Sequence, residues 1–98
     1  MDETKNSVLI VDDEKSNILV LTRILSREYT IFVAKDGEDA IEVANEYLPD
    51  VILLDILMPD MDGYDVITAL KSSDKTQHIP VIFITGLNNP TTRKGVSL

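Results

Sequence analysis

Short runs of apolar residues alternate along the chain with longer segments in which apolar residues recur at helical spacing. Three of the runs are nearly continuous in Val, Leu, Ile and Phe, at residues 8–11, 51–54 and 80–84. A strand that is buried on both faces has this uninterrupted apolar character. Residues 29–33 are β-branched and aromatic, so they predict one further strand. The pattern therefore predicts four strands.

Amphipathic segments occupy the intervals between these strands. Residues 16–27 predict the first helix, and a second begins at Gly37 and ends before Pro49-Asp50. A loop over residues 56–62, which ends in the turn signal Asp62-Gly63, precedes the third helix. The apolar residues at helical spacing are Ile18, Leu21, Ile24 and Leu25 in the first segment, Ala40, Ile41, Ala44, Tyr47 and Leu48 in the second, and Val66, Ile67 and Leu70 in the third.

This strand–helix alternation indicates the fold class. Parallel strands joined by right-handed helical crossovers give an α/β doubly wound sheet with helices on both faces. A length of 98 residues is enough for one hydrophobic core and leaves no room for a second. We therefore expect residues 1–98 to form a single domain with a four-stranded parallel sheet.

Composition and charge exclude several classes of function. The formal net charge of −8 argues against nucleic acid or an anionic membrane as the main partner. The chain has no cysteine and one histidine, His78, which excludes disulfides, zinc–thiolate sites and multi-histidine metal centres. No apolar run approaches the roughly 20 residues of a membrane helix, and the first residues lack the order of a signal peptide. We expect a cytoplasmic location.

The polar residues that follow the strands suggest where the chemistry lies. Asp12 and Asp13 follow the first strand, Asp55 the third, and Thr85 the fourth. The carboxyl ends of parallel strands share one edge of the sheet, where open α/β sheets bind ligands, so these side chains should converge. No lysine or arginine closely flanks them, and repulsion between three carboxylates favours a bound divalent cation, with Mg²⁺ preferred.

A simpler interpretation is that the aspartates only cap the helices that follow them. That interpretation explains one such residue, such as Asp13 before the first helix. It explains less well a doubled aspartate together with Asp55, which lies alone inside the apolar run of residues 53–58.

Three segments taken in order resemble the receiver domain of two-component response regulators. They are Val8-Leu9-Ile10-Val11-Asp12-Asp13-Glu14, the stretch from Val51 through Leu54-Asp55 to Asp62-Gly63, and Pro80-Val81-Ile82-Phe83-Ile84-Thr85-Gly86. The resemblance runs from Ser7 to about Ser97, which is nearly the whole chain. It implies a flavodoxin-like parallel sheet and a phosphorelay protein that acts in signal transduction.

The resemblance also implies a role for each site residue. Asp55 would be the phosphoacceptor, taking a phosphoryl group from a histidine kinase or phosphotransfer protein. Asp12, Asp13, Asp55 and the backbone carbonyl of Leu57 would hold Mg²⁺, and the Thr85 hydroxyl would contact the phosphoryl group. The chain would then be a signalling module rather than an enzyme, with at most weak self-phosphorylation and self-dephosphorylation.

One departure from the family pattern concerns the end of the chain. Receiver domains have a lysine at the end of a fifth strand, but only 13 residues follow Thr85. A parallel crossover alone needs about a dozen residues, and Lys94 does not fit the register of that lysine. We therefore expect a receiver domain truncated in its fourth helix, without the fifth strand and fifth helix. An open edge along strand 80–84 predicts self-association.

Two other functions remain as alternatives. A metal-dependent phosphohydrolase could use the same aspartyl chemistry, although such enzymes usually place an acidic residue where Leu57 stands. A non-phosphorylatable interaction or folding fragment is the other alternative, because the lysine is missing.

Overall fold

The computed structural model of the chain describes residues 5–56 and 63–84. These residues form seven elements in the alternating order that the sequence predicts. In chain order they are β1 (Asn6–Val11), α1 (Lys15–Leu25), β2 (Tyr29–Ala34), α2 (Gly37–Tyr47), β3 (Val51–Asp55), α3 (Gly63–Lys71) and β4 (Val81–Ile84).

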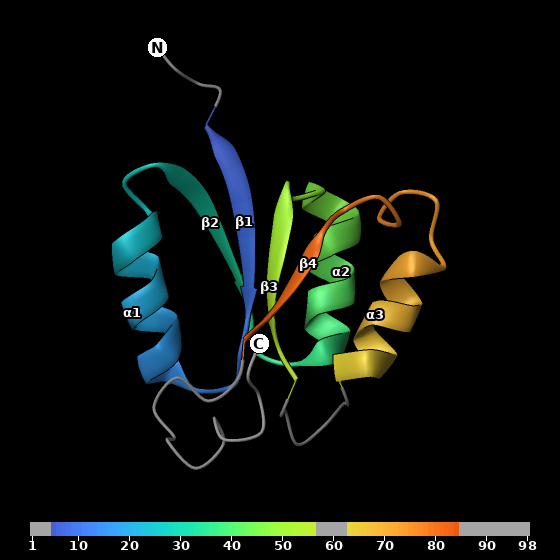
Figure 1. The fold of residues 1–98 in the computed structure, drawn as a ribbon, viewed down its shortest axis with the longest axis horizontal. Coiled ribbons are helices and arrows are strands. Elements are labelled where there is room, and N and C mark those ends of the chain that lie inside the picture. Colours follow the sequence, from blue (N-terminus) through green and yellow to red (C-terminus); the bar gives the residue numbers. More distant parts are fainter. Residues whose placement is uncertain (1–4, 57–62, 85–98) are drawn as a thin grey trace.

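The four strands form one parallel sheet in the order β2-β1-β3-β4. Figure 1 shows α1 on one face of this sheet and α2 and α3 together on the other. The predicted α/β class is thus confirmed in the described residues. The first crossover leads from β1 to β2 on one side of it. The second returns past β1 to β3 on the other side, so the direction in which strands are added reverses between β1 and β3. Open α/β sheets bind ligands at such a reversal.

The core lies mainly between the sheet and the pair α2 and α3. It is made of aliphatic side chains with at most 2% of their surface exposed: Leu9, Val11, Ala34, Ala40, Ala44, Ile52, Leu54, Val66, Leu70 and Ile79. Strand residues alternate between the two faces, so Leu9, Val11, Ile52 and Leu54 share the face that α2 and α3 cover. This packing fixes β1 and β3 side by side.

Several apolar residues of the predicted stripes remain exposed. Ile24 of α1 is 64% exposed, and Tyr47 and Leu48 at the end of α2 are also largely exposed. The Tyr47 ring stacks on the Phe32 ring with a centroid distance of 4.7 Å. This contact explains why an aromatic residue stands at a position that is only partly covered. Within the described ranges, the helices are too short or too polar to cross a membrane.

The ends of α2 show how local sequence sets an element's limits. The Asp36 side chain accepts a hydrogen bond of 2.8 Å from the backbone N–H of Asp39, which caps the first turn. The helix ends at Tyr47, and Leu48, the residue that caps it, has a φ of 49° in the left-handed region. Pro49 follows and cannot continue the helix, so the chain turns directly into β3.

The start of α3 approaches the end of β3 so closely that only glycine fits. A Cβ atom on Gly63 would lie 2.8 Å from the Cα atom of Ile56, which is backbone and cannot rotate away. We expect Gly63→Ala to lower the free energy of unfolding by about 1–3 kcal/mol, as overpacking does. Urea denaturation followed by circular dichroism measures this. Thr68→Ala, on the exposed side of the same helix, should change it by less than about 0.5 kcal/mol, and equal effects would contradict the steric explanation.

Self-association through the edge of the sheet stays a prediction. Within the described part of the chain, β4 is the last strand of the sheet, and its Ile82 is 52% exposed. The net charge of −8 opposes association, so we expect a sedimentation coefficient that rises with protein concentration and rises further with salt. Ile82→Lys should reduce the association. A single monomeric species at all concentrations and salt levels would refute the prediction.

Candidate functional site

The paired register of β1 and β3 brings their acidic ends together. Val11 is the partner of Leu54, so Asp12 and Asp55 are the next residues on two adjacent parallel strands. Both strands are held by aliphatic residues beneath them, and Asp55 also pairs with Ile84 of β4. The carboxylates therefore extend from a rigid part of the fold, although Asp12 and Asp13 lie just beyond the end of β1.

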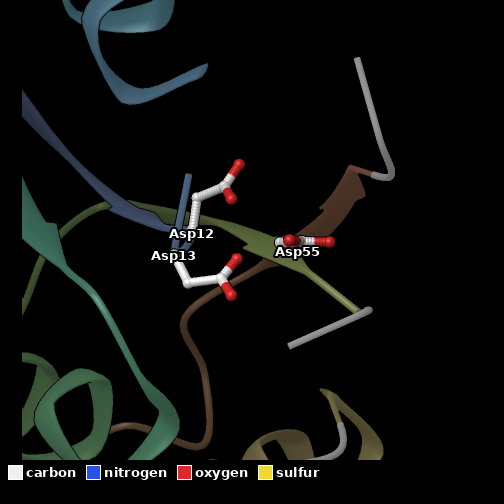
Figure 2. Close-up of side chains that lie close together, drawn as sticks. All are labelled: Asp12, Asp13 and Asp55. Carbon is white, nitrogen blue, oxygen red and sulfur yellow. The ribbon is translucent and has the colours of Figure 1, made fainter. Parts of the chain in front are cut away.

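Asp12, Asp13 and Asp55 form a compact cluster. One carboxylate oxygen from each lies within 4.8 Å of the corresponding oxygens of the other two. Figure 2 shows the three side chains grouped where β1 and β3 end. Asp12 is 1% exposed and Asp55 is 6% exposed, whereas Asp13 is open to solvent. The cluster thus has a buried base and one accessible member.

The chain around Asp12 holds its carboxylate in one orientation. The backbone N–H of Asp12 donates to the carbonyl of Ala34 at 3.1 Å, which continues the β1–β2 ladder. The backbone N–H of Glu14 donates to Oδ1 of Asp12 at 3.0 Å, and the Asn17 amide donates to Oδ2 at 3.1 Å. Both carboxylate oxygens thus accept hydrogen bonds from uncharged donors, which orient the group.

Asn17 is the site residue that the sequence analysis missed. It lies in α1, where it is 4% exposed and is the one fully buried residue of that helix. The sequence carried a partial signal, because Asn17 precedes the apolar Ile18 and follows the paired aspartates by one helical turn. That signal does not say which group its amide contacts, since the contact depends on how α1 packs.

The donor set of the cluster fits a hard divalent cation. Three carboxylates within 4.8 Å of one another repel, and two of them are nearly removed from water. Carboxylate oxygens are the ligands that Mg²⁺ accepts, and Mg²⁺ retains several of its waters. The exposed position of Asp13 leaves one side of the cluster open to such a hydrated ion.

The predicted site residues divide into two groups. The structure brings Asp12, Asp13 and Asp55 together, as the shared edge of a parallel sheet led us to expect. Thr85 and Leu57 lie outside the described residues, and so do residues 85–98, on which the expected truncation rests.

The sequence matches a known family over nearly its whole length. The sequence model of the response regulator receiver domain matches residues 8–97. A probable cyclic di-GMP phosphodiesterase of Vibrio cholerae is 45% identical over 89 residues, which are 91% of this chain and 20% of the relative. The chain thus spans about one fifth of the length of this curated relative.

Solved structures of similar sequence have the same fold. The N-terminal domain of a response regulator receiver protein from Methanoculleus marisnigri is 33% identical with a TM-score of 0.78, covering 90% of this chain and 73% of that one. The receiver domain of a sensor histidine kinase from Pseudomonas aeruginosa is 26% identical with a TM-score of 0.79, covering 93% and 75%. That structure has a magnesium ion coordinated in its active site cleft.

Proposed function

Because the chain belongs to the response regulator receiver domain family, we propose that Asp55 is the residue that accepts the phosphoryl group in its signalling reaction. The observation that carries the proposal is the cluster itself. Asp55 ends a buried strand with its carboxylate beside those of Asp12 and Asp13, at the edge of the sheet where ligands bind. Receiver domains of this family act as phosphoacceptor modules in two-component signalling, and we assign that chemistry to this position.

The proposed transfer needs a nucleophile and a group that neutralises the negative charge of the phosphoryl oxygens. A carboxylate oxygen of Asp55 attacks the phosphorus atom of a phosphohistidine, the O–P bond forms, and the P–N bond to the histidine breaks. The product is an aspartyl phosphate; the electron pair of the P–N bond stays on the histidine nitrogen, and the ring takes up one proton from water, so that the donor histidine leaves as a neutral imidazole. Asp55 is 6% exposed, so its carboxylate is poorly solvated and its position is set by β3 rather than by solvent.

The acidic neighbours of Asp55 would hold Mg²⁺. Asp13 would bind the ion directly, Asp12 would bind it at least through water, and Asp55 and the backbone carbonyl of Leu57 would complete the protein ligands. When bound, Mg²⁺ neutralises the charge on the phosphoryl oxygens, which a cluster of carboxylates would otherwise repel. The hydrogen bonds from Glu14 and Asn17 support this arrangement, because they orient Asp12 without neutralising it.

The remaining roles rest on the family pattern. We assign to Thr85 a hydrogen bond from its hydroxyl to a phosphoryl oxygen, since Thr85 directly follows β4 and Ile84 pairs with Asp55. The partner would be a histidine kinase or a phosphotransfer protein. The chain would catalyse at most a slow phosphorylation and dephosphorylation of itself.

Incubation with acetyl phosphate and Mg²⁺, followed by intact mass spectrometry, tests the proposal. We expect a mass increase of one phosphoryl group that depends on Mg²⁺ and decays with time. Consumption of acetyl phosphate with no adduct would instead support a phosphohydrolase. A chain that neither consumes acetyl phosphate nor gains mass would refute the phosphoacceptor function for these 98 residues.

A further inference from the structure

The buried amide of Asn17 has a contact that packing alone does not require. Asn17 is the third residue of α1 and is 4% exposed, whereas the other residues of that helix are partly or fully exposed. Burying an unpaired amide destabilises the fold, and an aliphatic side chain at the same position would avoid that cost. The Asn17 amide donates a hydrogen bond of 3.1 Å to Oδ2 of Asp12, which offsets that cost and directs the amide toward the acidic cluster.

The hydrogen bond from Asn17 completes the orientation of Asp12. Oδ1 of Asp12 accepts from the backbone N–H of Glu14 at 3.0 Å. One hydrogen bond restricts rotation of the carboxylate about its Cβ–Cγ bond less than two do, and the second bond, to the other oxygen, fixes the plane of the group. Because the first donor comes from the loop after β1 and the second from α1, the plane of Asp12 depends on how that helix docks.

A neutral donor suits this position for an electrostatic reason. A lysine or arginine at residue 17 would also hold Asp12, but it would cancel one of the three charges that attract a cation. An amide donates a hydrogen bond to a carboxylate and leaves its charge in place. Asn17 therefore orders Asp12 while the cluster keeps its full affinity for a divalent ion.

We infer that Asn17 is a positioning residue for the cation site, which acts through Asp12 and sets the affinity of the acidic cluster for Mg²⁺. The inference rests on the proposed function, since it needs Asp12 to serve the metal. Groups that orient a metal ligand by hydrogen bonding, without touching the ion, typically change metal affinity by about 10- to 100-fold when they are removed. The expected consequence is a change in Mg²⁺ binding that is separate from the stability of the fold.

The test compares two substitutions of the same chemistry by isothermal titration calorimetry with Mg²⁺ alone. Asn17→Leu, which removes the amide and keeps the volume, should raise the Kd for Mg²⁺ about 10- to 100-fold. Asn45→Leu is the matched control, since Asn45 is a partly buried asparagine whose amide donates to Ile41 in α2. It should leave the Kd unchanged. Urea denaturation without metal reports whether either variant loses stability.

A second measurement on the parent chain covers the case in which Asn17→Leu does not fold. In a Mg²⁺ titration followed by NMR, the side-chain amide signals of Asn17 should shift and saturate with the calorimetric Kd, while those of Asn45 stay in place. An unchanged Kd in a folded Asn17→Leu variant, or an Asn17 signal that does not move while Mg²⁺ binds, would overturn this inference alone. A parent chain that binds no Mg²⁺ would overturn both the inference and the proposed metal site.

Discussion

Asp55→Asn is expected to abolish the phosphoryl adduct completely. The substitution replaces one carboxylate oxygen by an amide nitrogen of similar size, so the packing at the end of β3 is preserved while the nucleophile is removed. An amide carries no negative charge and does not attack phosphorus at neutral pH. The loss should therefore be total, whereas changes that only weaken metal binding should slow the reaction.

The measurement is intact mass spectrometry after incubation with acetyl phosphate and Mg²⁺. Asp74→Asn makes the same chemical change at an exposed aspartate outside the cluster, and this variant should be phosphorylated like the parent. The fold of Asp55→Asn should remain intact, because the change removes one of three mutually repelling carboxylates. An adduct that persists in Asp55→Asn would place the phosphoacceptor at another residue and contradict the proposed role.

Asp13→Asn is expected to weaken metal binding at the acidic cluster. Asp13 is the exposed member of the cluster, so it offers its carboxylate to a hydrated ion at little cost in burial. Removing one of three charges that face a divalent cation should weaken binding about tenfold or more, which corresponds to about 1.4 kcal/mol. Because the substitution also relieves repulsion, the metal-free chain should be at least as stable as the parent.

Thermal or urea unfolding with and without Mg²⁺ measures this difference. At an ion concentration of 100 times the parent Kd, binding should stabilise the parent by about 2.7 kcal/mol, but a variant with a tenfold higher Kd by only about 1.4 kcal/mol. Asp74→Asn again serves as the control and should respond to Mg²⁺ like the parent. Equal stabilisation of Asp13→Asn and the parent would exclude Asp13 as a ligand.

The sequence predicted the elements because their signals are local. Residues 8–11 and 51–54 read as buried strands since a continuous apolar run needs no knowledge of its neighbours, and both lie in observed strands. The limits of elements were less accurate. β1 begins at Asn6, two residues before the apolar run, because Asn6 and Ser7 pair with Tyr29 and Thr30 of β2. β4 begins at Val81 and does not include Pro80, which has no N–H to donate to a sheet.

The convergence of Asp12, Asp13 and Asp55 was also predictable, for a topological reason. All parallel strands end at the same edge, so residues that follow adjacent strands meet there whatever the details of packing. What remained undetermined was which strands are adjacent. The apolar runs are too similar to show that β1 lies between β2 and β3.

Tertiary structure alone decided which apolar residues are covered and what holds the acidic cluster. Ile24 and Ile82 belong to strongly apolar patterns, yet both are mostly exposed, because burial depends on which surfaces the helices cover. The contact between Asn17 and Asp12 likewise exists only once α1 has docked on the sheet. Strand and helix character follow from periodicities within about ten residues, whereas a hydrogen bond between two elements depends on their relative position, which the whole core determines.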